Sequence, residues 1–532
     1  MDTSRPFFEA VFTAGELPQS IQWRDESTGD DYIFTSAFGS LRLRKRYSYP
    51  ATFAHCNGAV LSFGYGDITH GRFIASSELG AVAEHSFGVE EFLYAEIDCR
   101  SQSVMVQRDT ASVLPIFVAA HGRMLAMSNH SSRLYDMVGR KQVTINTLAA
   151  MNYMLFDDRY RALLDRSEPL YDRVRLTWRG GEYVVKHPPD GLITQLADMP
   201  ASNAGQFKQA LESTLDAYWD RYDNIAFQLS GGVDSAIAPG YYADKGNRVL
   251  TVSLGLPGQM GIRQRAKLTA MQERFGIDNY IVDLNPSKHT PFMEASQGNY
   301  IVSEFSDLHL VATKQLADYL AERRIATVFT GVGGDELCQN VNPRSVLPFG
   351  EMQEERLQAQ LPSYTTDAFA KLYQKIQTEA LAHTRGPVPA IAYSTLLTHL
   401  GFNNTFIDRN IWPVAPLANP TLFLFTQTIP AWHRYDKNLL RIYQFARGYP
   451  ESIVHPETTE DFSEFIHTCK PKLAQLFKDR FQTSRLVEQG LIDSDRLAHY
   501  VQEVVGAPFD KEDTRILELM RLLVLETNLQ QL

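Results

Sequence analysis

A seven-residue stretch, Leu-Ser-Gly-Gly-Val-Asp-Ser at positions 229–235, constrains the fold of this chain more than any other segment. It follows the apolar run 225–227 and leads into the apolar residues 236–238, so it is predicted to join a β-strand to a helix. Glycines in such a turn let the backbone approach an anion closely. The turn amides, the positive end of the helix dipole and two serine hydroxyls converge on one point. The stretch therefore predicts a phosphate-binding loop.

Asp234 is the member of this loop that phosphate binding alone does not explain. A carboxylate repels phosphate but binds magnesium, so its place is beside a magnesium-bound pyrophosphate such as that of ATP. No lysine follows the glycines, unlike in the G-x-x-x-x-G-K-[ST] phosphate loop. The alternative is an ordinary β-turn rich in serine and glycine. The expected ATP and pyrophosphate ligands of this loop are Leu229, Ser230, Gly231, Gly232, Val233, Asp234 and Ser235.

A second glycine-rich turn, further along the chain, also contains acidic residues. The β-branched run 326–330 predicts a buried parallel strand, and it leads directly into Gly-Val-Gly-Gly-Asp-Glu-Leu at 331–337. Ligands of open α/β sheets bind at the carboxyl ends of the strands, so both turns are expected to face one nucleotide. Asp234 and Asp335 would then bind one magnesium ion from opposite sides, with Gly331 next to the nucleotide. Taken alone, the second motif also fits a turn whose acid caps a helix.

Together the two motifs resemble those of the asparagine-synthetase family (class B), whose second motif commonly reads G-x-G-[AG]-D-E-L. The resemblance implies an N-type ATP pyrophosphatase, which breaks the α–β bond of ATP to give an acyl-adenylate and pyrophosphate. It implies catalytic roles for Ser230, Asp234 and Asp335. It also implies that the end of the strand predicted at 249–255 lies against adenine and ribose, through the backbone of Ser253, Leu254 and Gly255.

The character of the sequence changes near residue 200. Up to about residue 190, short alternating apolar runs separated by turn residues predict packed β-sheets. A polar connector follows at 188–203, and strands then alternate with helices as in a parallel doubly wound sheet. Helical patterns dominate from about residue 355. A chain of 532 residues is too long to fold around one hydrophobic core. The predicted domains are 1–195 and 205–532.

The first domain resembles the class II glutamine amidotransferase half of asparagine synthetases in residues 92–98, Arg108-Asp109 with 114–117, and 122–126. The resemblance implies an α+β fold with an amidotransferase-like β-sandwich. The second domain then resembles an α/β parallel-sheet ATP-pyrophosphatase (adenine nucleotide α-hydrolase-like) domain with a helical C-terminal part.

Glutaminase chemistry in that family uses a cysteine thiol exposed when Met1 is removed, but residue 2 here is Asp. A carboxylate is the weaker nucleophile and would give an anhydride instead of a thioester. Cys56 and Cys99 lie inside the chain and cannot present the α-amine that serves as base. We therefore expect a degenerate domain without glutamine hydrolysis, so that the attacking nitrogen comes from the substrate itself.

Relatives with this loss include β-lactam synthetases, the carbapenam synthetase and lasso peptide cyclases, in which an amine of the same molecule attacks the adenylate. Val332 stands where β-lactam-forming relatives usually carry a proton-relaying tyrosine, which disfavours β-lactam formation. Residues 333–343 look more like lasso peptide cyclases. So does the amphipathic helix predicted at 517–526, although ordinary core packing is the stronger explanation of its pattern.

The favoured interpretation is macrolactam (isopeptide) ring closure of a lasso peptide precursor, with ATP and Mg²⁺ as cofactors. The resemblance implies a leader-binding protein and a leader peptidase as partners. The alternatives are a β-lactam synthetase-like or other small-molecule amide ligase, and a non-catalytic scaffold of the same fold.

The sequence departs from its relatives in one catalytic position. They place a lysine after the helix corresponding to 437–441, where it neutralises phosphate and stabilises the oxyanion of the tetrahedral intermediate. Residues 451–465 contain neither Lys nor Arg. His455, Lys470 and Lys472 are the alternatives, and the late catalytic cation is left unassigned.

Two further family positions are less specific. Ser306-Asp307 lies where relatives contact nucleotide or substrate, but Asp307 fits a helix N-cap equally well. Residues 412–417 resemble a segment that packs beneath the active site.

Composition and charge indicate which kinds of partner and which cellular environment to expect. The net charge is −11 without a dense Lys/Arg tract, which does not favour nucleic acid as a partner. The four cysteines lie far apart, with no zinc-site spacing and no disulfide framework. No apolar run approaches the ~20 residues that span a bilayer, and no signal peptide is evident. We expect a cytoplasmic protein without a membrane partner.

Overall fold

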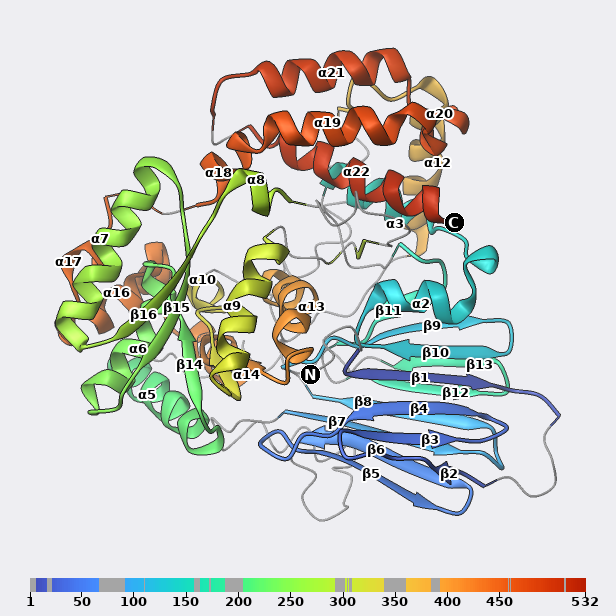
Figure 1. Ribbon diagram of the computed structural model, residues 1–532, viewed down its shortest axis with the longest axis horizontal. Helices are drawn as coiled ribbons and strands as arrows, with labels where there is room; N and C mark the ends of the chain where they lie inside the picture. Colours follow the sequence, from blue (N-terminus) through green and yellow to red (C-terminus); the bar gives the residue numbers. More distant parts are fainter. Residues whose placement is uncertain are drawn as a thin grey trace.

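The computed structural model describes most of the chain, and the fold reported below concerns those residues. They are 6–16, 22–66, 91–109, 111–156, 163–171, 174–186, 204–291, 302–303, 305, 309–338, 360–383, 393–457, 459, 461–510 and 513–532. Two antiparallel sheets form the first part of the chain, a parallel sheet follows, and helices cover the rest (Figure 1). An N-terminal antiparallel region and a later parallel sheet are therefore confirmed. The connector predicted at 188–203 and residue 2 lie outside the described residues.

Two antiparallel sheets are stacked in the first part of the chain, drawn in blue to cyan in Figure 1. The seven-stranded sheet has the order β11-β9-β10-β1-β4-β3-β2, and the six-stranded sheet has the order β13-β12-β8-β7-β6-β5. The strands of the first sheet are β11 (Ser167–Pro169), β9 (Phe117–His121), β10 (Met124–Ser128), β1 (Phe8–Thr13), β4 (Gly39–Arg44), β3 (Asp31–Thr35) and β2 (Arg24–Asp25). Those of the second are β13 (Glu182–Lys186), β12 (Arg175–Arg179), β8 (Ser103–Arg108), β7 (Phe92–Asp98), β6 (Val60–Gly66) and β5 (Thr52–Asn57).

Side-chain alternation explains why these strands stack. In β7, every second residue is fully buried (Leu93, Ala95 and Ile97), as the period of two along a strand requires. These side chains belong to the same apolar core as Phe12 and Leu41 of the other sheet. The helices α2 (Ser131–Val138) and α3 (Thr147–Phe156) accompany the strands.

The amidotransferase-like residues of this region have structural contacts. The buried Arg108 guanidinium donates to the carbonyls of Leu114, at 2.9 Å, and Leu170. The Asp109 carboxylate accepts from the amides of Phe92 and Ser112, each at 2.8 Å. Together these groups tie the turn after β8 to its neighbours, which satisfies buried backbone groups.

A parallel five-stranded sheet, ordered β16-β15-β14-β17-β18, organises the second part of the chain. Its strands are β14 (Ile225–Gln228), β15 (Leu250–Gly255), β16 (Asp278–Asp283), β17 (Thr327–Phe329) and β18 (Trp412–Val414). The helices that connect or accompany them are α5 (Ala204–Arg221), α6 (Val233–Asp244), α7 (Gly258–Phe275), α8 (Pro286–His289), α9 (Leu310–Glu322) and α10 (Gly334–Cys338). The strands predicted at 249–255 and 326–330 correspond to β15 and β17, and β14 lies between them.

Helices dominate after residue 360, as the sequence pattern predicts. They are α12 (Asp367–His383), α13 (Tyr393–Ile407), η4 (Pro416–Ala418), α14 (Pro420–Gln427), α15 (Ala431–Arg434), η5 (Tyr435–Lys437), α16 (Asn438–Ala446), α17 (Glu451–Val454), α18 (Ser463–Thr468), α19 (Lys470–Arg480), α20 (Arg485–Glu488), α21 (Ser494–Gly506) and α22 (Arg515–Gln531). Figure 1 shows α19, α21 and α22 gathered above the sheets. The helix predicted at 517–526 lies within α22, which is packed into the core. Its amphipathic pattern is therefore explained by core packing and says nothing about the type of enzyme.

A buried polar cluster joins β18 to the antiparallel sheets. The Trp412 indole N–H donates to Glu91 Oε2 at 2.7 Å, and the Arg46 guanidinium lies 5.6 Å from the Trp412 ring. Arg46 also donates to the carbonyls of Asn410 and Ala326, at 2.8 and 3.1 Å. Burial raises the pKa of Glu91 to about 8, so its carboxyl group is largely protonated at neutral pH.

Among the described residues, no helix is both long enough and apolar enough to cross a membrane.

Candidate active site

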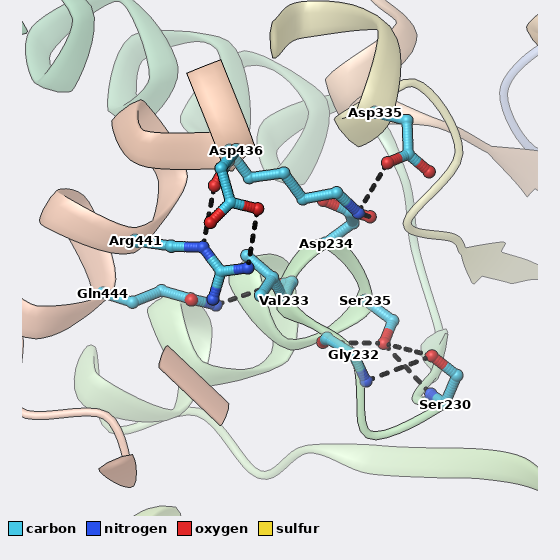
Figure 2. A network of polar contacts seen from close by, with 10 residues as sticks. Ser230, Gly232, Val233, Asp234, Ser235, Asp335, Asp436, Arg441 and Gln444 are labelled. Carbon is cyan, nitrogen blue, oxygen red and sulfur yellow. Dashed lines mark hydrogen bonds and ion pairs between the residues drawn. The ribbon is translucent and has the colours of Figure 1, made fainter. Parts of the chain in front are cut away.

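The 229–235 loop joins β14 to α6, as the sequence predicts. Its two serines hold it together, because the Ser230 and Ser235 hydroxyls lie 2.9 Å apart and the Ser230 amide donates to Ser235 Oγ at 3.0 Å. The Gly232 amide donates to Ser230 Oγ at 3.3 Å (Figure 2). Gly231 has φ +93°, a conformation that favours glycine. The loop is thus preformed, with its turn at the amino end of α6.

Gln264 of α7 anchors this loop to the neighbouring strand. Its buried side-chain amide donates to the carbonyls of Ser230 and Leu254, at 2.9 and 3.0 Å, and accepts from the Leu256 amide at 2.9 Å. One side chain therefore sets the distance between the loop and the end of β15. Sequence reasoning missed Gln264, because a glutamine within a helical pattern carries no local signal.

The predicted adenine-contacting residues lie at the carboxyl end of β15, next to the 229–235 loop. The Ser253 hydroxyl donates to the Leu229 carbonyl and to Asn279 Oδ1, so this side chain has a structural role. The sequence-based expectation that 253–255 contact a nucleotide through their backbone remains compatible with this arrangement.

The second glycine turn packs directly against the first. A Cβ atom on Gly331 would lie 2.6 Å from the Ser235 amide nitrogen, and one on Gly334 would lie 2.4 Å from Asp234 Cγ. Gly333, with φ +96°, packs against η4, where a Cβ would lie 2.3 Å from the Ala418 nitrogen. The spacing of the glycines in the second motif therefore reflects close backbone approach to the first motif on one side and to η4 on the other.

Asp234 and Asp335 meet at one ammonium group. Lys437 Nζ lies 2.6 Å from Asp234 Oδ2 and 2.6 Å from Asp335 Oδ1. Figure 2 shows both aspartates close together, Asp234 in the first turn of α6 and Asp335 at the start of α10. The structure therefore brings together the two acids that the sequence places 101 positions apart, since 335 − 234 is 101.

Burial shapes the electrostatics of this cluster. The Asp234 side chain is 17% exposed and that of Asp335 is 63% exposed. Burial raises the pKa of Asp234 to about 6, Lys437 opposes the rise, and the charge of Asp335 adds to it. Burial also disfavours the charge of Lys437, but its two aspartate partners outweigh that effect, so the pKa of Lys437 is raised. Lys437 is therefore a cation at neutral pH.

Lys437 is the cation at the aspartate pair, and the sequence analysis did not predict it. The prediction treated 437–441 as a helix and looked for the catalytic cation beyond it. In the structure α16 begins at Asn438, while Asp436 and Lys437 both have left-handed backbones with φ 50° and 56°. Such conformations cost roughly 1–3 kcal/mol each in non-glycine residues, and they cluster at functional sites. A lysine next to a helix carries no signal of this kind in the sequence.

The surrounding contacts keep this strained turn in place. Arg441 Nε donates to the Asp436 carbonyl at 2.8 Å, and Gln444 Nε2 donates to the Val233 carbonyl at 2.7 Å (Figure 2). The second contact joins α16 directly to the first turn of α6. Lys437 thus directly precedes α16, and α16 is hydrogen-bonded to the start of α6.

The three residues considered in the sequence analysis as the late catalytic cation make other contacts. Lys470 Nζ donates to the Ala507 carbonyl at 3.2 Å, and Lys472 Nζ donates to the Ser287 carbonyl at 2.6 Å. His455 follows α17, where its amide donates to the Glu451 carbonyl at 2.8 Å. No contact between these three side chains and the aspartate pair is seen within the described part of the chain. Residues 306–307 and 339–343 lie outside it.

The donor set suits a magnesium ion held jointly with phosphate oxygens. Asp234 Oδ1 is buried and accepts no hydrogen bond from the described residues, so it offers an unused anionic oxygen. Within those same residues no cluster of three or more His, Cys, Asp or Glu side chains could hold a metal by itself. Magnesium commonly binds through one or two carboxylates together with substrate phosphates, and the two aspartates fit that pattern.

Comparison with protein families identifies the segment that carries this site. Residues 206–403 match the model of the family described as Asparagine synthase. They include the 229–235 loop, β15 and Asp335, whereas Lys437 lies beyond the matched segment. The family implies ATP-dependent formation of a carbon–nitrogen bond through an adenylate, usually with Mg²⁺. The asparagine synthetase-like resemblance read from the two motifs is supported at this level.

Comparison with solved structures adds little. NMN synthetase from Francisella tularensis is 16% identical, with 39% of this chain and 96% of that chain covered and a TM-score of 0.20. Glutamine phosphoribosylpyrophosphate amidotransferase from B. subtilis, complexed with ADP and GMP, is 10% identical, with 54% and 78% covered and a TM-score of 0.18. At these TM-scores neither similarity carries an argument. No curated protein matches the chain.

Proposed function

We propose that this chain, with the asparagine synthase match over 206–403 as the premise, is an ATP- and magnesium-dependent ligase that adenylates a carboxylate and joins it to an amine. One observation carries the proposal. Asp234 and Asp335, from turns that follow two adjacent parallel strands, converge on the ammonium of Lys437 beside the 229–235 loop.

The residues of the site have distinct roles in this proposal. The 229–235 loop would bind the β- and γ-phosphates at the start of α6, with the Ser230 and Ser235 hydroxyls among its donors. The Asp234 and Asp335 carboxylates would hold magnesium, which when bound neutralises charge on the departing pyrophosphate. A substrate carboxylate oxygen would attack the α-phosphorus, and the α–β bond would break. Lys437 would then neutralise pyrophosphate, which is the role that relatives give to a lysine absent from residues 451–465 of this chain.

The second half of the reaction is amide formation from the adenylate. We propose that the amine belongs to the same molecule, so that the product is a macrolactam closed between an Asp or Glu side chain and the N-terminus of a precursor peptide. Intramolecular attack needs orientation above all, and a shaped site supplies an effective molarity worth roughly 7–11 kcal/mol. The precursor peptide, a leader-binding protein and a leader peptidase are the proposed partners.

The thiols of the first part of the chain support an internal amine source. Burial raises the pKa of Cys99 to about 11 and also raises that of Cys56. Neither thiol is therefore an activated nucleophile at neutral pH. This favours a domain in which neither of these two thiols carries out glutamine hydrolysis.

ATP–pyrophosphate exchange tests the proposal. Purified full-length protein is incubated with ATP, Mg²⁺, labelled pyrophosphate and a panel of peptides that carry an internal Asp or Glu. Exchange that depends on a peptide, followed by loss of one water from its mass, is the expected result. Asp234→Asn should abolish exchange, whereas Asp216→Asn, which removes a carboxylate paired with Lys245 on the surface, should not.

The outcomes separate the alternatives. Exchange with small amino-acid-derived acids but with no peptide would favour a small-molecule ligase. ATP binding without exchange with any acid would favour a non-catalytic scaffold and refute the proposed chemistry.

A further inference from the structure

The position between Asp234 and Asp335 is filled by a cation of the protein itself. Lys437 Nζ lies 2.6 Å from an oxygen of each carboxylate. Magnesium binds carboxylate oxygens at about 2.0–2.1 Å, so an ion bound to these same two oxygens would lie almost at the place of this ammonium. Two cations cannot share such a position, because the ion and the ammonium nitrogen would overlap and their like charges repel each other.

We propose that Lys437 holds the metal position in the nucleotide-free protein, and that a divalent ion enters only together with the phosphates of the nucleotide. This inference rests on the proposed function, because it assigns the aspartate pair to a metal. Free metal must displace the ammonium without offering it a new partner. A metal–pyrophosphate complex brings anionic oxygens to which the displaced ammonium can turn.

The surroundings of Lys437 allow this exchange without refolding. The lysine side chain is a flexible four-carbon stem, so its ammonium can swing while the backbone stays in place. The backbone below it is anchored, since Leu439 and Leu440 are buried and Gln444 is bonded to Val233. At 24% exposure, the Lys437 side chain is accessible enough to move toward an incoming ligand.

Lys437 also stabilises the aspartate pair when no metal is bound. Two carboxylates that share one position repel each other, and one of them, Asp234, is largely buried. The ammonium offsets that repulsion while the metal is absent. Metal and phosphate should therefore bind with positive coupling, each strengthening the other, as thermodynamic linkage requires.

Manganese binding to the nucleotide-free, full-length protein tests this directly, without any enzymatic turnover. Free Mn²⁺ is counted by electron paramagnetic resonance for wild type, Lys437→Met and Lys437→Gln. If the ammonium occupies the pair for about nine-tenths of the time, its removal tightens the apparent Mn²⁺ Kd about tenfold. The matched control is Lys245→Met, which removes the same charge from a pair with the single exposed carboxylate of Asp216.

Two further measurements locate the effect. The double variant Asp234→Asn/Lys437→Met should lose the gained affinity, which would place the added metal at this carboxylate. Wild type should bind Mn²⁺ at least several-fold more tightly when inorganic pyrophosphate is present. If both Lys437 variants keep the circular dichroism of wild type but bind Mn²⁺ no more tightly than Lys245→Met does, the inference is wrong. Equal Mn²⁺ affinity of wild type with and without pyrophosphate would also overturn it.

The result is separable from that of the exchange assay. Tighter Mn²⁺ binding by the Lys437 variants, with no pyrophosphate exchange by wild type on any acid, would keep the inference and reject the ligase. Exchange by wild type, with unchanged Mn²⁺ binding by the variants, would keep the ligase and reject the inference.

Discussion

Replacement of Glu91 by Gln should remove a pH-dependent weakness of the fold. Glu91 is 1% exposed, and burial raises its pKa from 4.5 to about 8. Between these two values the folded protein keeps a proton that the unfolded chain releases. The unfolded state thus binds fewer protons, and stability falls as pH rises. Glutamine keeps an acceptor for the Trp412 indole but cannot ionise.

The size of the effect follows from the shift. One pKa unit is worth roughly 1.4 kcal/mol, so the difference between 4.5 and about 8 corresponds to roughly 5 kcal/mol over the whole range. The stability contributed by the protonated carboxyl is complete below pH 4.5 and is lost as pH rises through about 8. The variant should gain on wild type by about 1.4 kcal/mol for each pH unit in that window.

Urea unfolding followed by tryptophan fluorescence at several pH values measures this gain. The control is Glu182→Gln, which replaces an exposed glutamate of β13. The result matters for the site, because Trp412 opens β18 and the following η4 turn supports Gly333. Parallel pH curves for Glu91→Gln and wild type between pH 5 and 8 would refute the reasoning.

Three further predictions concern the site itself. Gly334→Ala would place a Cβ 2.4 Å from Asp234 Cγ, so it should lower pyrophosphate exchange at least tenfold while Gly506→Ala, in open space, leaves it unchanged; equal rates for both would contradict the close approach. Gln264→Leu removes the link between Ser230 and Leu254, so it should destabilise the protein by about 1–3 kcal/mol and raise KM for ATP. Gln272→Leu, on the exposed side of α7, should have neither effect. Thermal unfolding and steady-state kinetics measure both effects. Because burial raises the pKa of Asp234 to about 6, protonation should compete with magnesium binding below that pH. Exchange at subsaturating Mg²⁺ should therefore fall between pH 7 and pH 5, and a rate that stays constant over that range would argue against this role.

Much of the site could be predicted because its signals are local. The 229–235 and 331–335 turns each follow a short apolar strand. Backbone conformation or close approach excludes other residues at Gly231, Gly331, Gly333 and Gly334. Parallel strands present their carboxyl ends at one edge of a sheet, so the convergence of Asp234 and Asp335 was predictable from order and spacing. The preference of the chain for lasso peptide chemistry remains a prediction, because it depends on segments such as 339–343 that lie outside the described residues.

The sequence by itself determined the alternation of strands and glycine turns, and with it the parallel sheet and the pair of acids at its edge. Only the tertiary structure decided which cation meets them. Lys437 reaches the pair because α16 returns to the start of α6 and a strained turn aims its side chain, and Gln264 sets the loop because α7 packs beside it. Contacts between residues far apart in the chain depend on how whole elements pack, and no short pattern in the sequence records that packing.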